Sequence, residues 1–283
     1  MREFKGKTAV VTGAASGMGR AFAERFAQEG MRVVLADVEA PALEAAVREL
    51  RQREHEVIGV RTDVRELAAV RELARRAVEA FGKVHVVCNN AGVDGYMEGP
   101  IWEATDKDWQ WTFGVNFWGV VNGVRAFLPL MLAQDEEGHV VNTCSATALV
   151  TANSMYGITK HAALAFSETV YAQLKQQDAK VGISALCPGL VTTRIFEGWR
   201  NRPPELRNEA SPEGTEQGRQ TRRMMHERLA AQGLAPDRVA DLVMEAIRDE
   251  QFYVTTDSDW DERMRARAEN ILERRNPVVQ PRA

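Results

Sequence analysis

Residues 10–20 of this chain read VVTGAASGMGR, and this stretch decides the fold. It continues a β-branched run that suits a buried strand, and residues 21–27 after it have helical spacing. The glycines therefore lie in a strand-to-helix turn, where the backbone can approach a ligand and the free N–H groups of the helix attract a pyrophosphate. We predict a dinucleotide-binding turn formed by Gly13, Ser16, Gly17, Met18 and Gly19.

The composition is that of an ordinary globular protein, with 283 residues, 45% hydrophobic and 27% charged. A net charge of −4 lacks the basic excess of a nucleic-acid binder. The sequence shows neither an apolar run long enough to span a membrane nor a signal peptide. We therefore expect a cytoplasmic protein that binds neither nucleic acid nor a membrane.

Three cysteines, Cys88, Cys144 and Cys187, lie in or beside apolar segments. Their spacing is not that of metal ligands, so we expect reduced, buried thiols and no metal site.

Strand-like runs alternate with helical patterns along the whole chain, which predicts βαβ units and a parallel sheet. Most of these runs are continuously apolar, as expected for strands covered by helices on both faces. The predicted strands are Thr8–Thr12, Arg32–Ala36, Val57–Arg61, Val84–Asn89, Gly138–Thr143, Val181–Cys187 and Phe252–Thr256. The sequence thus predicts an α/β Rossmann-type, doubly wound sheet of about seven strands, in a single domain over residues 1–283.

One segment, residues 194–232, departs from this alternation. It is rich in charge, contains Pro203, Pro204 and Pro212, and has no strand-like run. Long insertions in compact domains usually form lids or binding loops, so we expect this segment to cover the substrate.

The second predicted strand is followed at once by Asp37, 18 positions after Gly19. A carboxylate here accepts hydrogen bonds from the adenosine ribose and repels the extra phosphate of NADP. Ser16 and Val38 stand where a basic residue could have bound that phosphate. We therefore expect NAD rather than NADP, although Asp37 could also cap the helix that begins near Pro41.

Polar and small residues also follow the third and fourth predicted strands. Asp63, beside Val64, either hydrogen-bonds the adenine amino group or caps a helix that begins near Arg65, and the sequence leaves both roles open. After the fourth strand, small residues allow a cofactor to pass over the backbone. These residues are Asn90, Ala91 and Gly92.

A long apolar helix is predicted from about Asp106 to Leu132, with Asn116 near its middle. An asparagine there competes with the backbone for hydrogen bonds. Asn116 is either a satisfied buried amide or the site of a local helix break.

Tyr156 and Lys160 are four residues apart, so on a helix they project from one face. An ordinary phenol has a pKa near 10, and a nearby ammonium group favours the phenolate. We therefore expect Lys160 to lower the pKa of Tyr156 and to make it a general acid/base. Lys160 could also hold the nicotinamide ribose.

Together these motifs resemble the short-chain dehydrogenase/reductase family, in its short single-domain branch. The resemblance spans about the first two hundred residues and includes, in order, the glycine turn, Asp37, Asp63-Val64, the Asn90 segment, Asn116, Tyr156 and Lys160. It implies NAD(P)-dependent alcohol/ketone chemistry with Asn116, a serine, Tyr156 and Lys160 as the catalytic set. It also implies cofactor contacts at a later motif, made by Pro188, Gly189, Val191 and Thr193, the last to the nicotinamide carboxamide.

The serine of this set departs from the family spacing. Family members usually place it thirteen positions before the tyrosine, where this chain has Thr143, whereas Ser145 stands eleven before it. We assign Ser145, because the strand end fixes where a hydroxyl points and the following loop can absorb a deletion. Thr143 and Thr147 are the alternatives.

In the resulting mechanism Ser145 holds the substrate oxygen and Tyr156 exchanges its proton. The sequence leaves open a non-catalytic NAD-binding sensor or scaffold, because fold does not fix function. An epimerase or dehydratase that uses NAD internally is disfavoured.

The sequence gives the least information on the substrate and on the oligomeric state. An apolar pocket suggests a bulky hydrophobic or aromatic secondary alcohol or ketone, and its candidate residues are Leu149, Val150, Met155, Phe196 and Trp199. The family resemblance implies a homotetramer or a dimer through the helices near residues 109–132 and 155–177.

Overall fold

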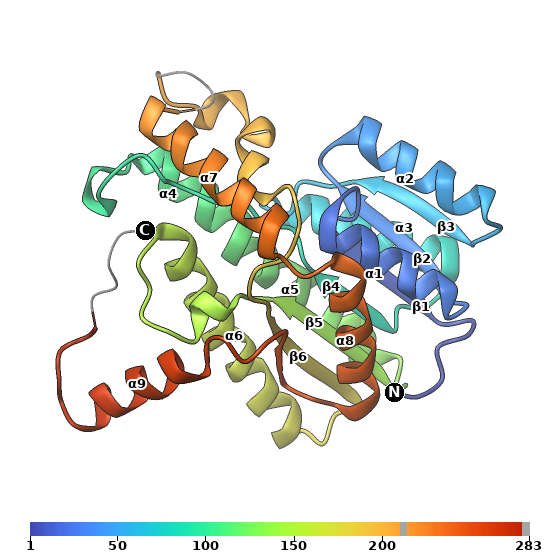
Figure 1. Cartoon of the computed structure of the whole chain (residues 1–283). Helices are drawn as coiled ribbons and strands as arrows, with labels where there is room; N and C mark the ends of the chain where they lie inside the picture. Colours follow the sequence, from blue (N-terminus) through green and yellow to red (C-terminus); the bar gives the residue numbers. More distant parts are fainter. Residues whose placement is uncertain (210–213, 279–283) are drawn as a thin grey trace.

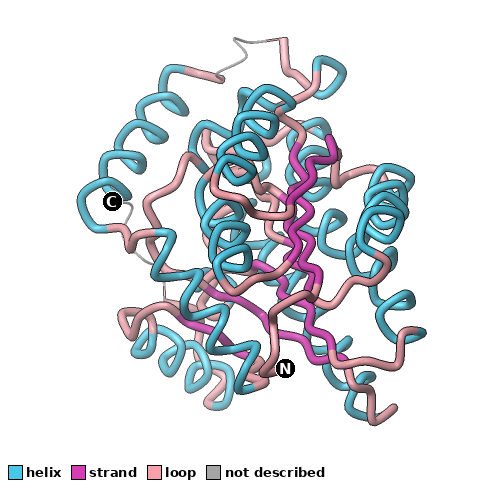
Figure 2. The backbone as a smooth tube through the Cα atoms, turned by 90° about the vertical axis from the view of Figure 1, so that its right-hand side faces the viewer, coloured by secondary structure: helices cyan, strands magenta, loops and turns pink. Residues whose placement is uncertain are grey.

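The computed structural model describes residues 1–209 and 214–278. Within these residues the chain forms a seven-stranded parallel sheet in the order β3-β2-β1-β4-β5-β6-β7, with helices on both faces (Figures 1 and 2). This is the predicted Rossmann-type fold. The strands are β1 (Thr8–Thr12), β2 (Arg32–Asp37), β3 (Val57–Arg61), β4 (Val86–Asn89), β5 (Gly138–Thr143), β6 (Val181–Cys187) and β7 (Tyr253–Thr255).

Four predicted strands have the observed bounds, namely β1, β3, β5 and β6. β2 extends one residue further to include Asp37, while β4 and β7 are shorter than predicted. Every residue of β1 is buried, as continuous apolar patterning requires of a strand covered on both faces.

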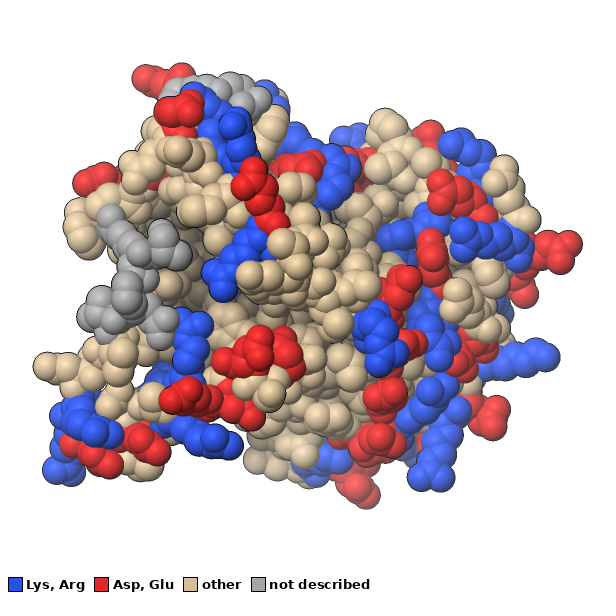
Figure 3. All heavy atoms as spheres, in the orientation of Figure 1, with Lys and Arg blue, Asp and Glu red and all other residues tan. Residues whose placement is uncertain are grey.

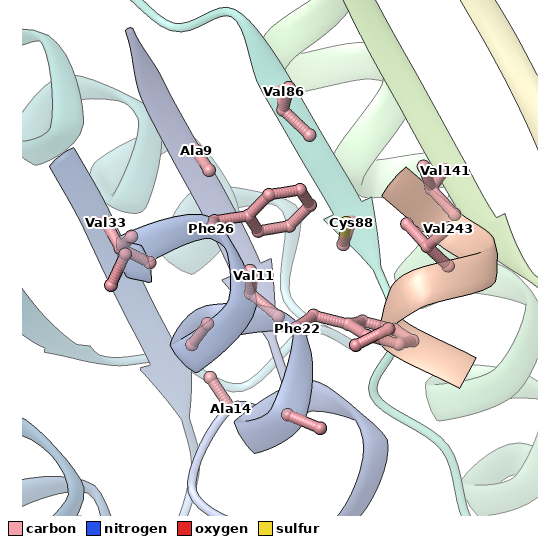
Figure 4. Packing of buried hydrophobic residues seen from close by; sticks show 14 of the residues in the cluster. Ala9, Val11, Ala14, Phe22, Phe26, Val33, Val86, Cys88, Val141 and Val243 are labelled. Carbon is pink, nitrogen blue, oxygen red and sulfur yellow. The ribbon is translucent and has the colours of Figure 1, made fainter. Parts of the chain in front are cut away.

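Two helical layers cover the sheet. α1 (Gly17–Gln28), α2 (Ala40–Gln52) and α8 (Pro236–Asp249) pack on one face. α3 (Leu67–Phe81), α5 (Gly119–Ala133) and α6 (Met155–Gln176) pack on the other. Figure 4 shows Phe22 and Phe26 of α1 lying between the strands and Val243 of α8.

The predicted long helix is present but interrupted. It consists of α4 (Asp106–Phe113), a π-helical turn at Gly114–Trp118, and α5. Thr105 and Asp108 form a capping box at its start. Asn116 lies inside the π-helical turn, so the expected local break occurs there.

The expectation that no segment is long and apolar enough to span a membrane was wrong. The continuous helix Asp106–Ala133 meets both criteria by length and composition. Its most apolar stretch is 56% buried, and α5 packs against β4, β5 and α3, which is typical of a core helix.

The charged insertion forms short 3-10 helices and one long helix. These are η4 (Ile195–Asn201), η5 (Pro204–Leu206) and α7 (Glu216–Gln232), and α7 crosses above the sheet in Figure 1. Pro212 lies outside the described residues. A charged helix, α9 (Asp261–Leu272), follows β7; it extends away from the sheet (Figure 1) and carries both signs of charge (Figure 3).

Replacing Phe26 tests the packing between α1 and the sheet. Its side chain is 1% exposed, so Phe26→Ala should lower the free energy of unfolding by about 3–5 kcal/mol in urea denaturation. Trp102 is 81% exposed, and Trp102→Ala should change it by no more than about 0.5 kcal/mol. Equal losses in the two variants would contradict this account of the core.

Candidate active site

A cleft lies at the carboxyl ends of the strands. Most of the predicted cofactor contacts line it: Gly13, Ser16, Gly17, Met18, Asp37, Asp63, Val64, Asn90, Ala91, Gly92, Tyr156, Lys160 and Thr193. The other predicted site residues, which lie outside its described lining, are Gly19, Asn116, Ser145, Pro188, Gly189 and Val191. Parallel topology explains this gathering, because all strands end at the same edge of the sheet.

The glycine turn is built for close approach. Gly13 has a φ of +65°, and a Cβ there would lie 3.0 Å from the Cα of Ala91. A Cβ on Gly19 would lie 2.2 Å from the carbonyl oxygen of Gly13, so this glycine serves the packing of helix on turn.

Helix α1 begins directly at the cleft. Its N-cap, Ser16, makes no side-chain capping bond within the described chain, and Gly17 and Met18 of the first turn line the cleft. The free N–H groups and positive end of the helix therefore face the space a pyrophosphate needs. These residues fit a dinucleotide.

Thr12 fastens the ends of β1 and β4 together. Its hydroxyl accepts hydrogen bonds from the backbone N–H groups of Asn90, at 2.9 Å, and Ala91, at 3.1 Å. The Asn90 amide donates back to the carbonyl of Thr12 at 3.0 Å. The sequence analysis did not assign Thr12 to the site, although its place at the end of the central strand was a usable signal.

The Asp37 carboxylate lies at the other end of the cleft. It accepts hydrogen bonds from the N–H groups of Ala15 and Glu39, each at 3.0 Å. Burial raises the pKa of Asp37, and these bonds counteract the rise. The N-cap of α2 is Glu39, so the helix-capping role considered for Asp37 was wrong.

Asp63 is held by its neighbour Arg65. Its carboxylate accepts bonds from the backbone N–H of Arg65 at 3.0 Å and from the guanidinium at 2.7 Å. Because α3 begins at Leu67 with Glu66 as its N-cap, Asp63 does not cap that helix.

Asn116 joins three parts of the site. Its side-chain oxygen accepts from the N–H of Val93 at 2.8 Å, and its amide donates to the Val93 carbonyl at 2.9 Å. The same amide donates to the Thr159 hydroxyl on α6 at 3.1 Å. Asn116 is therefore a hydrogen-bonded buried amide, and it also lies in the π-helical turn that interrupts the helix.

Tyr156, Lys160 and Ser145 meet at the end of β5. Ser154 caps α6 by accepting from the N–H of Gly157, which places Tyr156 in the first turn and Lys160 one turn later. The Lys160 ammonium is buried, donates to the carbonyl of Thr143 at 2.8 Å, and lies 5.5 Å from the Tyr156 ring centre.

Three hydroxyls compete for the substrate oxygen, and the structure separates them. Ser145 accepts from the N–H of Thr147 at 3.2 Å, and of the three hydroxyls it is the one that acts to lower the pKa of Tyr156. The Thr143 hydroxyl donates to Asn90 at 3.3 Å instead. The Thr147 hydroxyl is buried without a partner among the described residues.

The expected effect of Lys160 on Tyr156 is absent from the protein alone. Burial raises the pKa of Tyr156 to about 12, and the Ser145 bond only moderates that rise. Burial also lowers the pKa of Lys160 to about 8. Desolvation is the largest cause of both shifts, so the phenol in this state is a weaker acid than the spacing predicts.

The insertion supplies part of the cleft wall through residues that the sequence analysis did not name individually. Arg194, Ile195, Gly198, Arg200 and Asn201 line the cleft opposite Asp37. They lie more than 150 positions from Asp37 in the chain, so no local pattern could have joined them to it.

Ion pairs fasten the same segment to the core at two further places. Arg202 contacts Asp108 at 2.6 Å, and Arg222 of α7 contacts the buried Asp94 at 2.8 Å.

The three cysteines are free and buried, as predicted. Over residues 1–209 and 214–278, no cluster of three or more His, Cys, Asp or Glu side chains is arranged to hold a metal ion.

A parallel sheet with a glycine turn at its central strand, and a Ser-Tyr-Lys set at the same edge, define a Rossmann-type dinucleotide-dependent oxidoreductase. Residues 7–204 match the family described as short chain dehydrogenase. The chain belongs to the short-chain dehydrogenase/reductase family, whose members act on CH–OH groups.

Known proteins of this family resemble the chain over nearly its whole length. It is 37% identical over 254 residues to 1-deoxy-11-beta-hydroxypentalenate dehydrogenase of Streptomyces avermitilis, covering 89% of this chain and 85% of that protein. It is 31% identical to the diacetyl reductase [(S)-acetoin forming] of Staphylococcus epidermidis, over 68% of this chain and 74% of that protein.

A short-chain dehydrogenase/reductase from Burkholderia phymatum, solved in complex with NAD, is 45% identical. The superposition covers 100% of both chains, with a TM-score of 0.95.

Removing the Lys160 charge should stabilise the cofactor-free protein at neutral pH. The lysine pKa of about 8 in the fold and 10.5 in the unfolded chain corresponds to about 3 kcal/mol of destabilisation. After subtracting about 1 kcal/mol for the lost bond to Thr143, Lys160→Met should gain about 2 kcal/mol at pH 7.

The sign of the pH dependence follows from proton binding. Between about pH 8 and 10.5 the unfolded lysine binds more protons, so wild-type stability rises with pH and the advantage of the variant shrinks. Denaturation at pH 7 and pH 10 checks this, with Lys180→Met, whose side chain is 55% exposed, as control. A difference independent of pH would contradict the assigned burial of the charge.

Proposed function

We propose that the protein is an NAD-dependent oxidoreductase that interconverts a secondary alcohol and a ketone, with Tyr156 as general acid/base. The observation that carries this proposal is the buried Lys160 ammonium 5.5 Å from the Tyr156 ring centre, with both residues lining the same cleft as the glycine turn and the Asn90 segment. Ser145 lies just after β5, and its hydroxyl counteracts the rise in the Tyr156 pKa that burial causes.

Each side chain has a separate task in this proposal. Ser145, held by the N–H of Thr147, donates a hydrogen bond to the substrate oxygen. Tyr156 removes the proton of the alcohol, or returns it to the ketone oxygen in reduction. The bound nicotinamide accepts or supplies the hydride at the substrate carbon.

Lys160 and Asn116 support this proton transfer. The Lys160 ammonium lies 5.5 Å from the centre of the Tyr156 ring, where its positive charge stabilises a phenolate that develops during proton transfer. Asn116 fixes the backbone after Gly92 through its two bonds to Val93. The cofactor floor and the catalytic helix therefore keep their relative positions.

The carboxylate at the end of β2 supports a preference for NAD. Asp37 lines the cleft and its oxygens already accept two backbone bonds, so its charge is held in place. A phosphate on the adenosine ribose would meet this charge and that of Glu39 two residues on. The NAD complex of the Burkholderia relative agrees with this preference.

The substrate we propose is hydrophobic or aromatic. Apolar side chains in the cleft include Val93, Trp111, Val115 and Ile195. The residues expected from the sequence, Leu149, Val150, Met155, Phe196 and Trp199, lie outside the cleft's described lining.

A homo-oligomer, a tetramer or else a dimer, is part of the same proposal. Trp118, Leu130 and Leu132 expose large apolar surfaces along the helix Asp106–Ala133. Covering such surface with a second copy is favourable. The cytoplasmic location remains a prediction.

Turnover tests the proposal directly. The protein should reduce NAD+ with bulky secondary alcohols from a panel running from small aliphatic to aromatic. Tyr156→Phe should lower kcat by about 10²–10⁴-fold, because the proton acceptor is lost, while NADH still binds. Undiminished kcat would refute the role of Tyr156. NADH binding without turnover across the panel would favour the non-catalytic sensor.

The hydroxyl assignment has its own test. Ser145→Ala should lower kcat/KM by about 10²-fold, as expected for loss of one oriented donor to the reacting oxygen. Thr143→Val removes only the 3.3 Å bond to Asn90 and should leave kcat/KM nearly unchanged. The reverse ranking of these two variants would transfer the role to Thr143.

A further inference from the structure

A three-residue bridge crosses the rim of the cleft beside Asp37. One carboxylate oxygen of Glu39, in the loop after β2, accepts from Arg200 at 2.9 Å through Nε and contacts Nη2 at 2.7 Å. The same oxygen accepts from the Asn201 amide at 2.6 Å. All three residues line the cleft, so the bridge joins η4 to the opposite wall.

The position and partial exposure of the bridge allow it to open and close. The Glu39 and Arg200 side chains are 25% and 22% exposed, which puts the ion pair at the rim rather than in the core. Partly exposed pairs contribute little to fold stability, so this one can open without unfolding its surroundings. Desolvation opposes ionisation of Glu39, but the bonds from Asn201 and Arg200 outweigh it and hold the Glu39 pKa below its ordinary value.

The bridge also decides what the Arg200 guanidinium can bind. Its Nε and Nη2 are directed at Glu39, and its Nη1 donates to the Glu197 carbonyl at 2.8 Å. A second arginine, Arg194, lines the cleft at the start of η4 and contacts the Glu197 carboxylate at 2.5 Å. These two cleft-lining cations, Arg194 and Arg200, are therefore both engaged by carboxylates.

We propose that Glu39, Arg200 and Asn201 form a latch that closes the cleft over the adenosine half of the dinucleotide and sets cofactor choice by withholding Arg200 from a 2′-phosphate. The proposal rests on the proposed NAD-dependent function, in which Asp37 marks the adenosine end. A guanidinium fork binds carboxylate and phosphate with the same geometry, so Glu39 occupies the site that the phosphate of NADP would need.

Three variants separate the parts of the latch. Glu39→Gln should raise NADPH affinity about tenfold, because the freed fork of Arg200 gains a charge-assisted bond to phosphate. The double variant Glu39→Gln with Arg200→Gln should lose that gain. Arg200→Gln alone should release NADH several-fold faster in stopped-flow displacement, without tighter NADPH binding. Calorimetric titration with NADH and NADPH measures the affinities without any turnover.

Glu49→Gln is the matched control. Glu49 contacts Arg20 at 2.9 Å and is 57% exposed, so its replacement removes the same charge from an arginine pair outside the cleft. Two outcomes would overturn the latch. In the first, Glu39→Gln and Glu49→Gln have the same ratio of NADPH to NADH affinity. In the second, the double variant keeps the full gain in NADPH affinity. The second result would mean that mere loss of negative charge, not Arg200, admits the phosphate.

The affinities of the unaltered protein for NADH and NADPH distinguish failure of the latch from failure of the proposed function. Equal affinity for NADH and NADPH in the unaltered protein would contradict the NAD preference. Clear NADH preference that Glu39→Gln leaves unchanged would contradict the latch alone. Loss of turnover in Tyr156→Phe affects neither measurement, because both report binding.

Discussion

The parallel pairing of β1 with β4 is the constraint on which the rest of the site depends. From β1 the chain builds outward through β2 and β3, then returns to build β4 to β7 on the other side. The loops after β1 and β4 therefore leave the sheet in opposite directions and open a crevice between them. Thr12 fixes the width of that crevice with three hydrogen bonds, two that its hydroxyl accepts from the backbone N–H groups of Asn90 and Ala91 and one that its carbonyl accepts from the Asn90 side-chain amide.

Several features around this crevice are unfavourable for stability but serve the proposed chemistry. A buried ammonium, a phenol whose pKa is near 12 and a helix start without a side-chain cap in the described chain are each unfavourable in isolation. The insertion follows a different rule. It supplies arginines, Arg200, Arg202 and Arg222, to carboxylates on the core, so charge complementarity rather than a large apolar contact positions it.

Much of the fold was readable from the sequence because its determinants are local. Continuous apolar runs located the strands, and a glycine turn with an acidic residue after the next strand located the cofactor edge. The four-residue spacing of Tyr156 and Lys160 placed both on one helical face. Features set by tertiary surroundings were not readable. The pKa of Tyr156 depends on burial by distant elements, and Arg200 meets Glu39 only after the chain has folded.

The π-helical turn at Gly114–Trp118 carries a consequence for how this helix tolerates changes in length. An α-helix advances about 100° per residue, whereas a π-helical turn takes up one additional residue within about one turn. Trp111 before this turn lines the cleft, and the buried residues of α5 after it pack on the sheet. Deleting one residue in this turn would therefore restore regular winding with both halves in their present orientation, whereas a deletion elsewhere in the helix would rotate one half against the other by that angle.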